Sequence, residues 1–317
     1  MKTVVGSRAS AVLYNVLKSN GISGNVVVPA NICESVPAVY ILAGLNVIFC
    51  DISHPTWQPD CHEILNLLKE NNISVLHYNH TYGAVLEEDD TFLSRVRNLY
   101  PELLIVDDCC LDFPEYGAYD RPVDVALFST GPTKCVNIGW GGIGLLAERL
   151  KYFEEREMSF SQEDLEAFRK HIKYCHEYKR PIDYEVIRSK WLDFRYEPDH
   201  FFARIEHEKS LILKHKETLN QIYSPLPGSL PKAYCNWRYQ LLLENAQECC
   251  DELFRNGLYC SRHYMSLGNG YFSDVNTPVA DYLAGHILNL FNDFCYTEEQ
   301  ARNTADILMK IAIPAKI

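Results

Sequence analysis

Short apolar segments alternate with helical segments along the first third of this 317-residue sequence. The apolar segments span 25–29, 46–50, 73–78 and 103–106. The segments with helical spacing span 32–43, 60–71 and 89–99. Runs rich in Val, Ile and Leu are typical of strands that are buried on both faces. The repeated strand and helix order therefore predicts an α/β fold with a mostly parallel sheet between helices.

Length and composition limit the function classes. The chain can bury a large core, and its length favours a large domain with a smaller second one. It has no apolar run near twenty residues and no signal-peptide core at its start, so we expect a cytoplasmic protein without a membrane partner. The twelve cysteines lack metal-ligand spacing, so we expect reduced thiols and no metal. A net charge of −12 opposes nucleic-acid binding as the main role.

A single lysine, Lys134, lies in a turn-rich segment between two short apolar runs, 123–128 and 143–146. Most lysines in such loops simply reach solvent. The alternative is a nucleophilic lysine that forms a Schiff base with a cofactor held by glycine-rich backbone.

Two carboxylates, Asp107 and Asp108, follow the apolar segment 103–106. Ligands of open α/β sheets bind at this carboxyl edge. A carboxylate there can pair with a cation, bind Mg²⁺ or hold a pyridinium nitrogen, but it can also be a helix cap. Lys134 comes one strand later, so both residues could face one pocket. Pyridoxal phosphate (PLP) requires such a pair.

The sequence Gly6-Ser7-Arg8 precedes a helical pattern that runs to about Asn20. We expect the helix to begin here. The free N–H groups and the Ser7 hydroxyl could bind a phosphate, with Arg8 adding charge. An ordinary serine cap is the alternative.

Several short motifs occur in the same order as in one enzyme family. They are 26–33, Ala43-Gly44, 47–51, His80-Thr81-Tyr82-Gly83, Val106-Asp107-Asp108 and Phe128-Ser129 with Pro132-Thr133-Lys134. The C-terminal part matches more loosely, at His263-Tyr264 and 296–300. In these motifs the chain resembles the DegT/DnrJ/EryC1/StrS family of PLP-dependent sugar aminotransferases.

The resemblance implies a fold-type-I PLP-transferase fold: a large domain with a mostly parallel mixed sheet sandwiched by helices, and a smaller C-terminal α+β domain. We expect the large domain at 1–200, with a helical insertion at about 151–184. The small domain would span 201–317 and begin with a linker helix.

The resemblance also implies site residues. Lys134 and Asp108 would be catalytic. The cofactor would contact Gly6, Ser7, Arg8, Cys33, His80, Asp108, Ser129 and Lys134. Substrate would contact Tyr82, Arg195, His263 and Tyr264. The site would be shared between the two subunits of a homodimer.

The implied activity is transfer of an amino group from an amino acid, usually glutamate, to a keto sugar, usually nucleotide-linked. Such enzymes serve surface-polysaccharide or secondary-metabolite biosynthesis. Lysine rather than histidine at position 134 argues against the family's sugar dehydratases.

The chain departs from the family pattern at Cys33, Leu111, Trp140 and Asp193. Cys33 replaces an aromatic residue that stacks on the cofactor ring in many members. These departures leave a second reading open, a PLP-fold protein that has lost catalysis and acts as a binding or regulatory partner. A nicotinamide-binding domain is the third reading, but no Gly-x-Gly-x-x-Gly follows the first strand.

Overall fold

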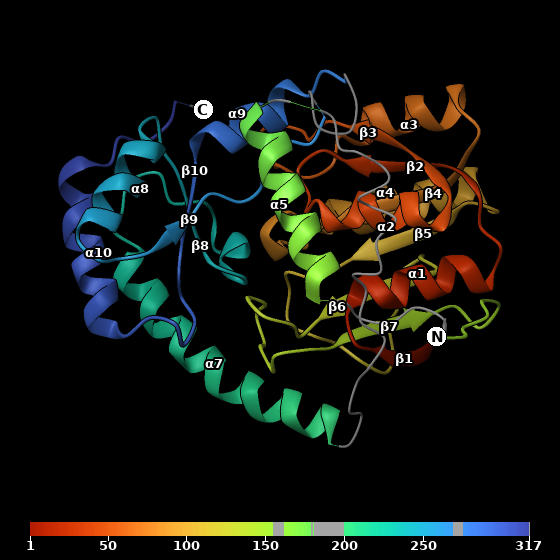
Figure 1. Cartoon of the computed structure of the whole chain (residues 1–317), viewed down its shortest axis with the longest axis horizontal. Helices are drawn as coiled ribbons and strands as arrows, with labels where there is room; N and C mark the ends of the chain where they lie inside the picture. The colour runs from red at the N-terminus through yellow and green to blue at the C-terminus, as the bar shows by residue number, and fades with distance from the viewer. Residues whose placement is uncertain (155–161, 179, 181–199, 269–274, 317) are drawn as a thin grey trace.

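A seven-stranded sheet forms the centre of the larger part of the molecule (Figure 1). The computed structural model describes residues 1–154, 162–178, 180, 200–268 and 275–316. The strand order is β1-β7-β6-β5-β4-β2-β3, and β2 to β6 run parallel, whereas β7 and β1 are antiparallel to their neighbours. The strands are β1 (Lys2–Gly6), β2 (Gly24–Pro29), β3 (Leu45–Cys50), β4 (Ile73–Asn79), β5 (Leu104–Asp108), β6 (Val125–Ser129) and β7 (Gly142–Leu146).

Helices cover both faces of this sheet. They are α1 (Ala9–Ser19), α2 (Ser35–Ala43), α3 (Cys61–Glu70), α4 (Glu87–Leu99), α5 (Gln162–Tyr178) and α7 (Phe201–Tyr223), with the short helix η1 (Thr81–Gly83). Side chains of α1 and α2 form the first core with one face of the strands, and α5 adds Ile172 and Cys175 to it. Side chains of α3, α4 and the first half of α7 form the second core with the other face.

Residue alternation along β5 decides which way its polar end points. Leu104 and Val106 belong to the first core, whereas Ile105 belongs to the second. Since successive side chains of a strand point to opposite faces, Asp107 lies on the α4 side and Asp108 on the α2 side. The two adjacent aspartates therefore enter different environments.

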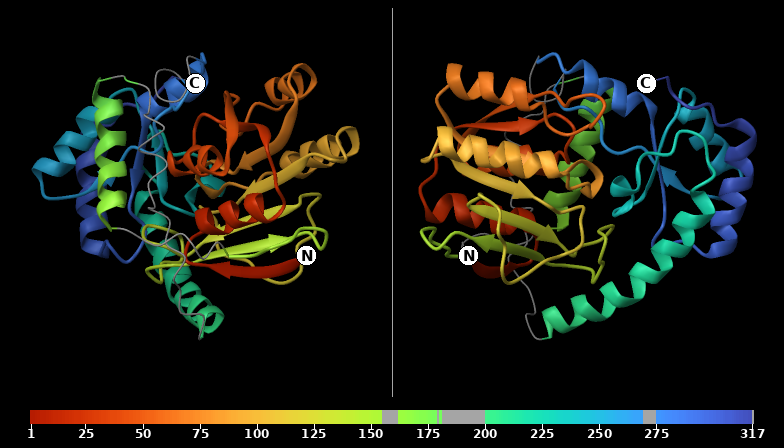
Figure 2. Two further views of the ribbon diagram at one scale, coloured as in Figure 1. Left: turned by 45° about the vertical axis from the view of Figure 1, so that its right-hand side comes forward. Right: turned by 180° about the vertical axis from the view of Figure 1, so that it is seen from behind.

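The C-terminal part holds a second, three-stranded sheet with the order β8-β10-β9 (Figure 2). Its elements are η2 (Lys232–Cys235), β8 (Tyr239–Leu242), α8 (Ala246–Arg255), β9 (Cys260–Ser261), α9 (Pro278–His286), β10 (Ile287–Leu290) and α10 (Glu298–Ile311). Helix α7 runs between the two parts, with Ile212 in the second core and Leu219 and Tyr223 in the C-terminal core. Because one helix contributes to both cores, a domain boundary at residue 200 stays a prediction.

The predicted α/β class and the four predicted parallel strands are confirmed, with strand ends within two residues of the expected ones. The predicted helix start at Gly6 is wrong. Gly6 ends β1 and pairs with Gly142 of β7, and α1 begins at Ala9. None of the described helices has both the length and the apolar composition needed to cross a bilayer.

Candidate active site

A cavity of about 500 Å³ lies at the carboxyl ends of the parallel strands. Residues that follow or end β2, β4, β5 and β6 line it, together with residues of the loop before α1 and of the C-terminal part. Those discussed below are Ser7, Arg8, Cys33, His77, His80, Asp108, Cys110, Leu111, Ser129, Lys134, Trp140, Arg169, Trp237, His263 and Tyr264. Most of the predicted site residues therefore meet around a single cavity.

One end of the cavity is built from three adjacent strands. In the registers of β1, β7 and β6, Gly6 pairs with Gly142, which pairs in turn with Ser129. This alignment brings the Ser7 loop beside Ser129. Ser7 is only 3% exposed, and its Oγ makes no hydrogen bond to any part of the chain that the structure describes. A buried hydroxyl without a partner normally costs free energy, so Ser7 is suited to a ligand that accepts a hydrogen bond.

The first turn of α1 closes the same end. A Cβ on Gly142 would lie 2.0 Å from the Ala9 backbone nitrogen, so only glycine allows β7 to approach the helix start this closely. Free N–H groups and the helix dipole make such a helix start favourable for an anion, and Arg8 in the cavity lining adds positive charge. This end of the cavity can bind a phosphate.

Asp108 is held from two sides. His77 Nε2 lies 3.1 Å from its Oδ2, and the Cys110 backbone N–H donates to its Oδ1 over 2.9 Å. Burial alone would raise the pKa of this carboxyl, but the hydrogen bonds from His77 and Cys110 outweigh burial and hold the pKa of Asp108 well below its usual range. The cavity therefore contains a fixed negative charge.

Lys134 lies in the loop between β6 and β7 and is half-buried. Its ammonium makes no hydrogen bond or ion pair with any described residue, so it is available to a ligand. The loop itself is anchored, because Trp237 Nε1 donates to the Thr133 carbonyl over 2.6 Å. An anchored loop with a free amine is suited to a lysine that must meet a ligand in one geometry.

The structure places His80 differently from the expected cofactor contact. His80 is in the cavity lining, but its Nε2 lies 2.6 Å from Asp107 Oδ1 and its Nδ1 lies 3.2 Å from Asp89 Oδ2. Arg121 Nη1 and the Tyr119 hydroxyl bond to Asp107 at 3.0 and 2.6 Å. With both ring nitrogens engaged by carboxylates, His80 serves this buried cluster, and its contact with a cofactor stays a prediction.

The same cluster has the spacing of a metal site but already contains a cation. Ligand atoms of His80, Asp107 and Cys109 lie within 4.8 Å of one another. Arg121 Nη1, however, is 2.9 Å from His80 Nε2 and 3.0 Å from Asp107. Its guanidinium supplies the positive charge that a metal ion would bring.

Two thiols face the cavity, Cys33 and Cys110. Burial, followed by the nearby charge of Glu34, raises the pKa of Cys33 to about 11. Burial and Asp108 also raise the pKa of Cys110 well above its usual value. Both therefore remain neutral thiols at pH 7 and present small, polarisable surfaces.

The C-terminal part adds an aromatic wall. Trp237 stacks with Tyr264 at a centroid distance of 6.0 Å, and His263 meets the Trp237 ring edge-on. Partial burial, with the charges of Arg238 and Lys134, lowers the pKa of His263 to about 4. Tyr82 stacks on Trp237 at 6.3 Å but is not among the lining residues, so its substrate contact remains a prediction.

Two further residues that depart from the family pattern, Trp140 and Leu111, pack against other side chains. The ring of Trp140 packs on Phe201 of α7 at 4.9 Å, and Leu111 belongs to the first core. Arg195 and Asp193 lie outside the described residues. Sequence reasoning missed His77, Trp237 and Arg169 of α5, all in the lining. Only His77 had a detectable signal, because alternation along β4 and β5 puts it on the face of Asp108.

Comparison with solved structures identifies the fold. A DegT DnrJ EryC1 StrS aminotransferase from Brucella abortus superposes with a TM-score of 0.67 at 15% identity, over 98% of this chain and 86% of that one. This is a fold-type-I PLP-transferase fold. DesI in the presence of its TDP-sugar product matches with a TM-score of 0.65 at 17% identity, over 98% and 80% of the two chains.

GDP-4-keto-6-deoxy-D-mannose-3-dehydratase of E. coli has the same fold, with a TM-score of 0.62 at 14% identity, over 97% of this chain and 87% of that one. The fold thus includes both aminotransferases and a dehydratase, and identities this low establish the fold alone. No family model and no curated protein matches the sequence.

Proposed function

We propose that the protein is a PLP-dependent aminotransferase. The proposal rests on one observation: the Lys134 amine, which has no partner among the described residues, and the ionised Asp108 carboxylate line the same cavity. At the end of that cavity, the unpartnered Ser7 hydroxyl and the start of α1 offer a phosphate site. These residues fit PLP, whose phosphate, ring nitrogen and aldehyde require an anion site, a carboxylate and an amine.

Bound PLP would supply an electron-withdrawing ring and a carbonyl group that takes up and gives back an amino group. The protein's own residues would bind the cofactor and transfer the proton. Ser7, Ser129 and the first turn of α1 would hold the phosphate, and Asp108 would hold the ring nitrogen in its protonated form. Lys134 would take the proton from the donor's Cα as general base and return it as general acid.

The proposed donor is glutamate, and the proposed acceptor is a nucleotide-linked keto sugar, since the names of two structural neighbours contain nucleotide-linked sugars. Lys134 stands where the family's dehydratases carry histidine, which favours amino transfer. Arg8, Arg169 and the aromatic wall could meet an anionic, ring-shaped substrate.

We further propose a cytoplasmic homodimer with shared sites. The twelve cysteines are all unpaired, including Cys250 and Cys260, whose sulfur atoms lie 3.3 Å apart. Most of these cysteines are buried, and buried free thiols without metal-ligand spacing are typical of proteins in a reducing compartment. Arg195 would approach the partner's cavity, as the resemblance implies.

Absorbance spectra of the purified protein with added PLP test the activity. The wild type should show a visible band, and this band should be lost in both Lys134→Ala and Lys134→Arg, the second of which keeps the charge. Excess glutamate should move the wild-type band to shorter wavelength and release one equivalent of 2-oxoglutarate per bound cofactor. A wild type without a lysine-dependent band at saturating PLP would be a binding protein that keeps the fold.

A further inference from the structure

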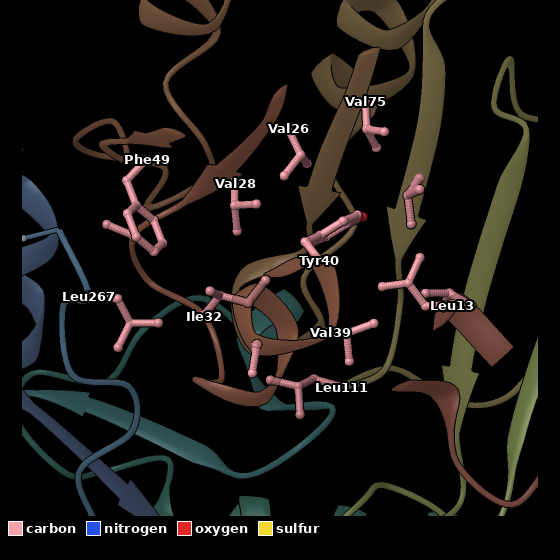
Figure 3. Close-up of a cluster of buried hydrophobic side chains, with 14 of the residues drawn as sticks. Leu13, Val26, Val28, Ile32, Val39, Tyr40, Phe49, Val75, Leu111 and Leu267 are labelled. Carbon is pink, nitrogen blue, oxygen red and sulfur yellow. The ribbon is translucent and has the colours of Figure 1, made fainter. Parts of the chain in front are cut away.

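A buried chain of two hydrogen bonds leads from α2 to Asp108. The Tyr40 hydroxyl lies 2.8 Å from His77 Nδ1, and His77 Nε2 lies 3.1 Å from Asp108 Oδ2. Tyr40 and His77 are both 0% exposed, and Asp108 is 9% exposed. Figure 3 shows Tyr40 between α2 and the sheet, on the face that carries Val26, Val28 and Val75. The two hydrogen bonds therefore connect Asp108 to the buried contact between α2 and the sheet.

The hydrogen-bond partners fix the direction of the chain. An ionised Asp108 can only accept, so His77 Nε2 carries a proton and donates. The Tyr40 hydroxyl has His77 as its hydrogen-bond partner within the described part of the chain. Its proton is satisfied only if Nδ1 accepts it, since burial and Asp108 raise the pKa of Tyr40 and keep the phenol protonated. Tyr40 thus donates to His77, and His77 donates to Asp108.

This arrangement has two consequences for Asp108. The Cys110 N–H and His77 occupy one oxygen each, which fixes the rotation of the carboxylate. Because Nδ1 of His77 accepts from Tyr40 while Nε2 donates to Asp108, the two hydrogen bonds fix the orientation of the ring and point its N–H at the carboxylate. The carboxylate keeps its negative charge available to the cavity.

We propose that Tyr40 and His77 are positioning residues that fix the orientation and charge of Asp108 toward the ring nitrogen of the cofactor. The inference rests on the proposed function, because it concerns the group that Asp108 would hold. Tyr40 is not among the lining residues of the cavity, and His77 lines it with both ring nitrogens engaged, so both act through Asp108.

The other face of β4 provides a matched comparison. Tyr78, the neighbour of His77, is also 0% exposed, and its hydroxyl donates to Asp89 over 2.7 Å. That bond belongs to the cluster of His80 and Asp107, on the α4 side of the sheet. Tyr40→Phe and Tyr78→Phe therefore each delete one buried hydroxyl that bonds to a polar cluster, but only the first is connected to Asp108.

The test uses the holoprotein loaded with PLP that is ¹⁵N-labelled in the ring, and it follows the ring-nitrogen resonance from pH 6 to 9. We expect a protonated ring nitrogen throughout this range in the wild type and in Tyr78→Phe. In Tyr40→Phe and His77→Phe the nitrogen should lose its proton within the range. His77→Gln, which keeps an N–H donor, should restore part of the wild-type behaviour. The PLP dissociation constant should rise about 10-fold in His77→Phe.

The possible failures are distinguishable. If the wild type forms no lysine-dependent band, the proposed function fails and this inference falls with it. If the wild type binds PLP but both Tyr40→Phe and His77→Phe keep its ring-nitrogen signal, the positioning role is wrong while the proposed function stands. Should His77→Phe fail to fold, Tyr40→Phe against Tyr78→Phe still decides the matter. Equal effects of the two tyrosine variants would also overturn the inference.

Discussion

Ser7 carries a buried hydroxyl that makes no hydrogen bond with any described residue. Its Oγ has no partner in the described chain, yet the backbone of its loop is fixed, since the Gly141 N–H donates to the Ser7 carbonyl over 2.8 Å. A polar group that is held in place but left without a partner suits a ligand better than it suits folding. The contribution of Ser7 to PLP binding can therefore be measured separately from its contribution to the stability of the apoprotein.

Ser7→Ala should leave the unfolding free energy of the apoprotein within about 0.5 kcal/mol of wild type, because the substitution removes no hydrogen bond to a described residue. The PLP dissociation constant should rise about 10-fold, the value of one hydrogen bond to a charged phosphate. Urea denaturation and PLP titration measure the two quantities. Ser19→Ala, at the opposite end of α1, is the control with the reverse outcome: it removes the hydrogen bond that Ser19 Oγ accepts from the Phe153 N–H over 2.9 Å, so stability should fall while PLP binding stays unchanged. A large loss of apoprotein stability in Ser7→Ala would instead assign the hydroxyl a structural role.

His80 makes stability depend on pH. Burial by itself would lower the pKa of this histidine, but the adjacent Asp107 carboxylate outweighs burial and raises the pKa of His80 well above its usual value. Conversely, burial would raise the pKa of Asp107, but His80 and Arg121 bring it down to about 2. The folded protein thus retains the His80 proton above about pH 6.5, where the unfolded chain releases it.

Stability should therefore fall as pH rises above about 6.5, by up to about 1.4 kcal/mol per pH unit from this one group. The contribution of Asp107 is complete above about pH 4 and is lost as the pH falls toward 2. In His80→Gln the decline above pH 6.5 should be reduced, which urea denaturation at several pH values would reveal. His62→Gln, which removes an exposed histidine on α3, is the control. An unchanged slope in His80→Gln would locate the dependence elsewhere.

Among the elements, the contact between β7 and α1 creates the phosphate end of the cavity. With glycine at position 142, the strand packs directly against the backbone of Arg8 and Ala9. A Cβ at this position would lie 2.2 Å from the Arg8 carbonyl carbon and 2.0 Å from the Ala9 nitrogen. The registers of β7 with β1 and β6 determine where along the strands this contact lies. The geometry of the helix start is thus decided by strand packing.

Gly142→Ala should move the start of α1 away from β7. We expect a loss of about 1–3 kcal/mol in unfolding free energy, typical of overpacking, together with weaker PLP binding. Gly285→Ala is the matched control, because Gly285 lies inside α9 with nothing within 4 Å of an added Cβ. It should be neutral or stabilise by up to about 1 kcal/mol. Denaturation and PLP titration of both variants would show whether the effect is specific to position 142.

For the molecule as a whole, Asp51 connects distant parts of the chain. It follows β3, and its carboxylate accepts from the backbone N–H groups of Val279 and Ala280 at the start of α9, over 2.9 and 2.8 Å. Helix α9 also adds Ala280 and Leu283 to the first core. The end of β3 therefore holds the start of α9, in the C-terminal part of the chain, against the sheet.

Asp51→Ala should destabilise the protein by about 1–2 kcal/mol, since it removes the only side-chain oxygen seen to cap α9 among the described residues. Hydrogen exchange should increase at 278–286. Asp60→Ala is the matched control, because Asp60 accepts from two N–H groups at the start of α3, within the large part. Its stability cost should be similar, but exchange at 278–286 should not change. Equal exchange in the two variants would refute a connecting role for Asp51.

The sequence alone was sufficient to predict the parallel strands and the helices between them. Strands buried on both faces are continuous apolar runs, and helices that cover a sheet are amphipathic, so both leave a pattern in the sequence. It was also sufficient to bring Asp108, Ser129 and Lys134 to one edge, since parallel strands share their carboxyl ends. Strand β1 was missed because five residues that end in glycine carry little periodicity, and only pairing with β7 makes them a strand.

Tertiary structure decided which polar residues serve the cavity. His77 and His80 are three residues apart, yet one bonds to Asp108 and the other to Asp107. The resemblance pointed to His80, but strand alternation places His77 on the face of the cavity carboxylate. Trp237 and Arg169 reach the cavity from segments more than thirty positions beyond Lys134. Such contacts depend on how α5 and the C-terminal part pack against the sheet, and no local pattern in the sequence records that packing.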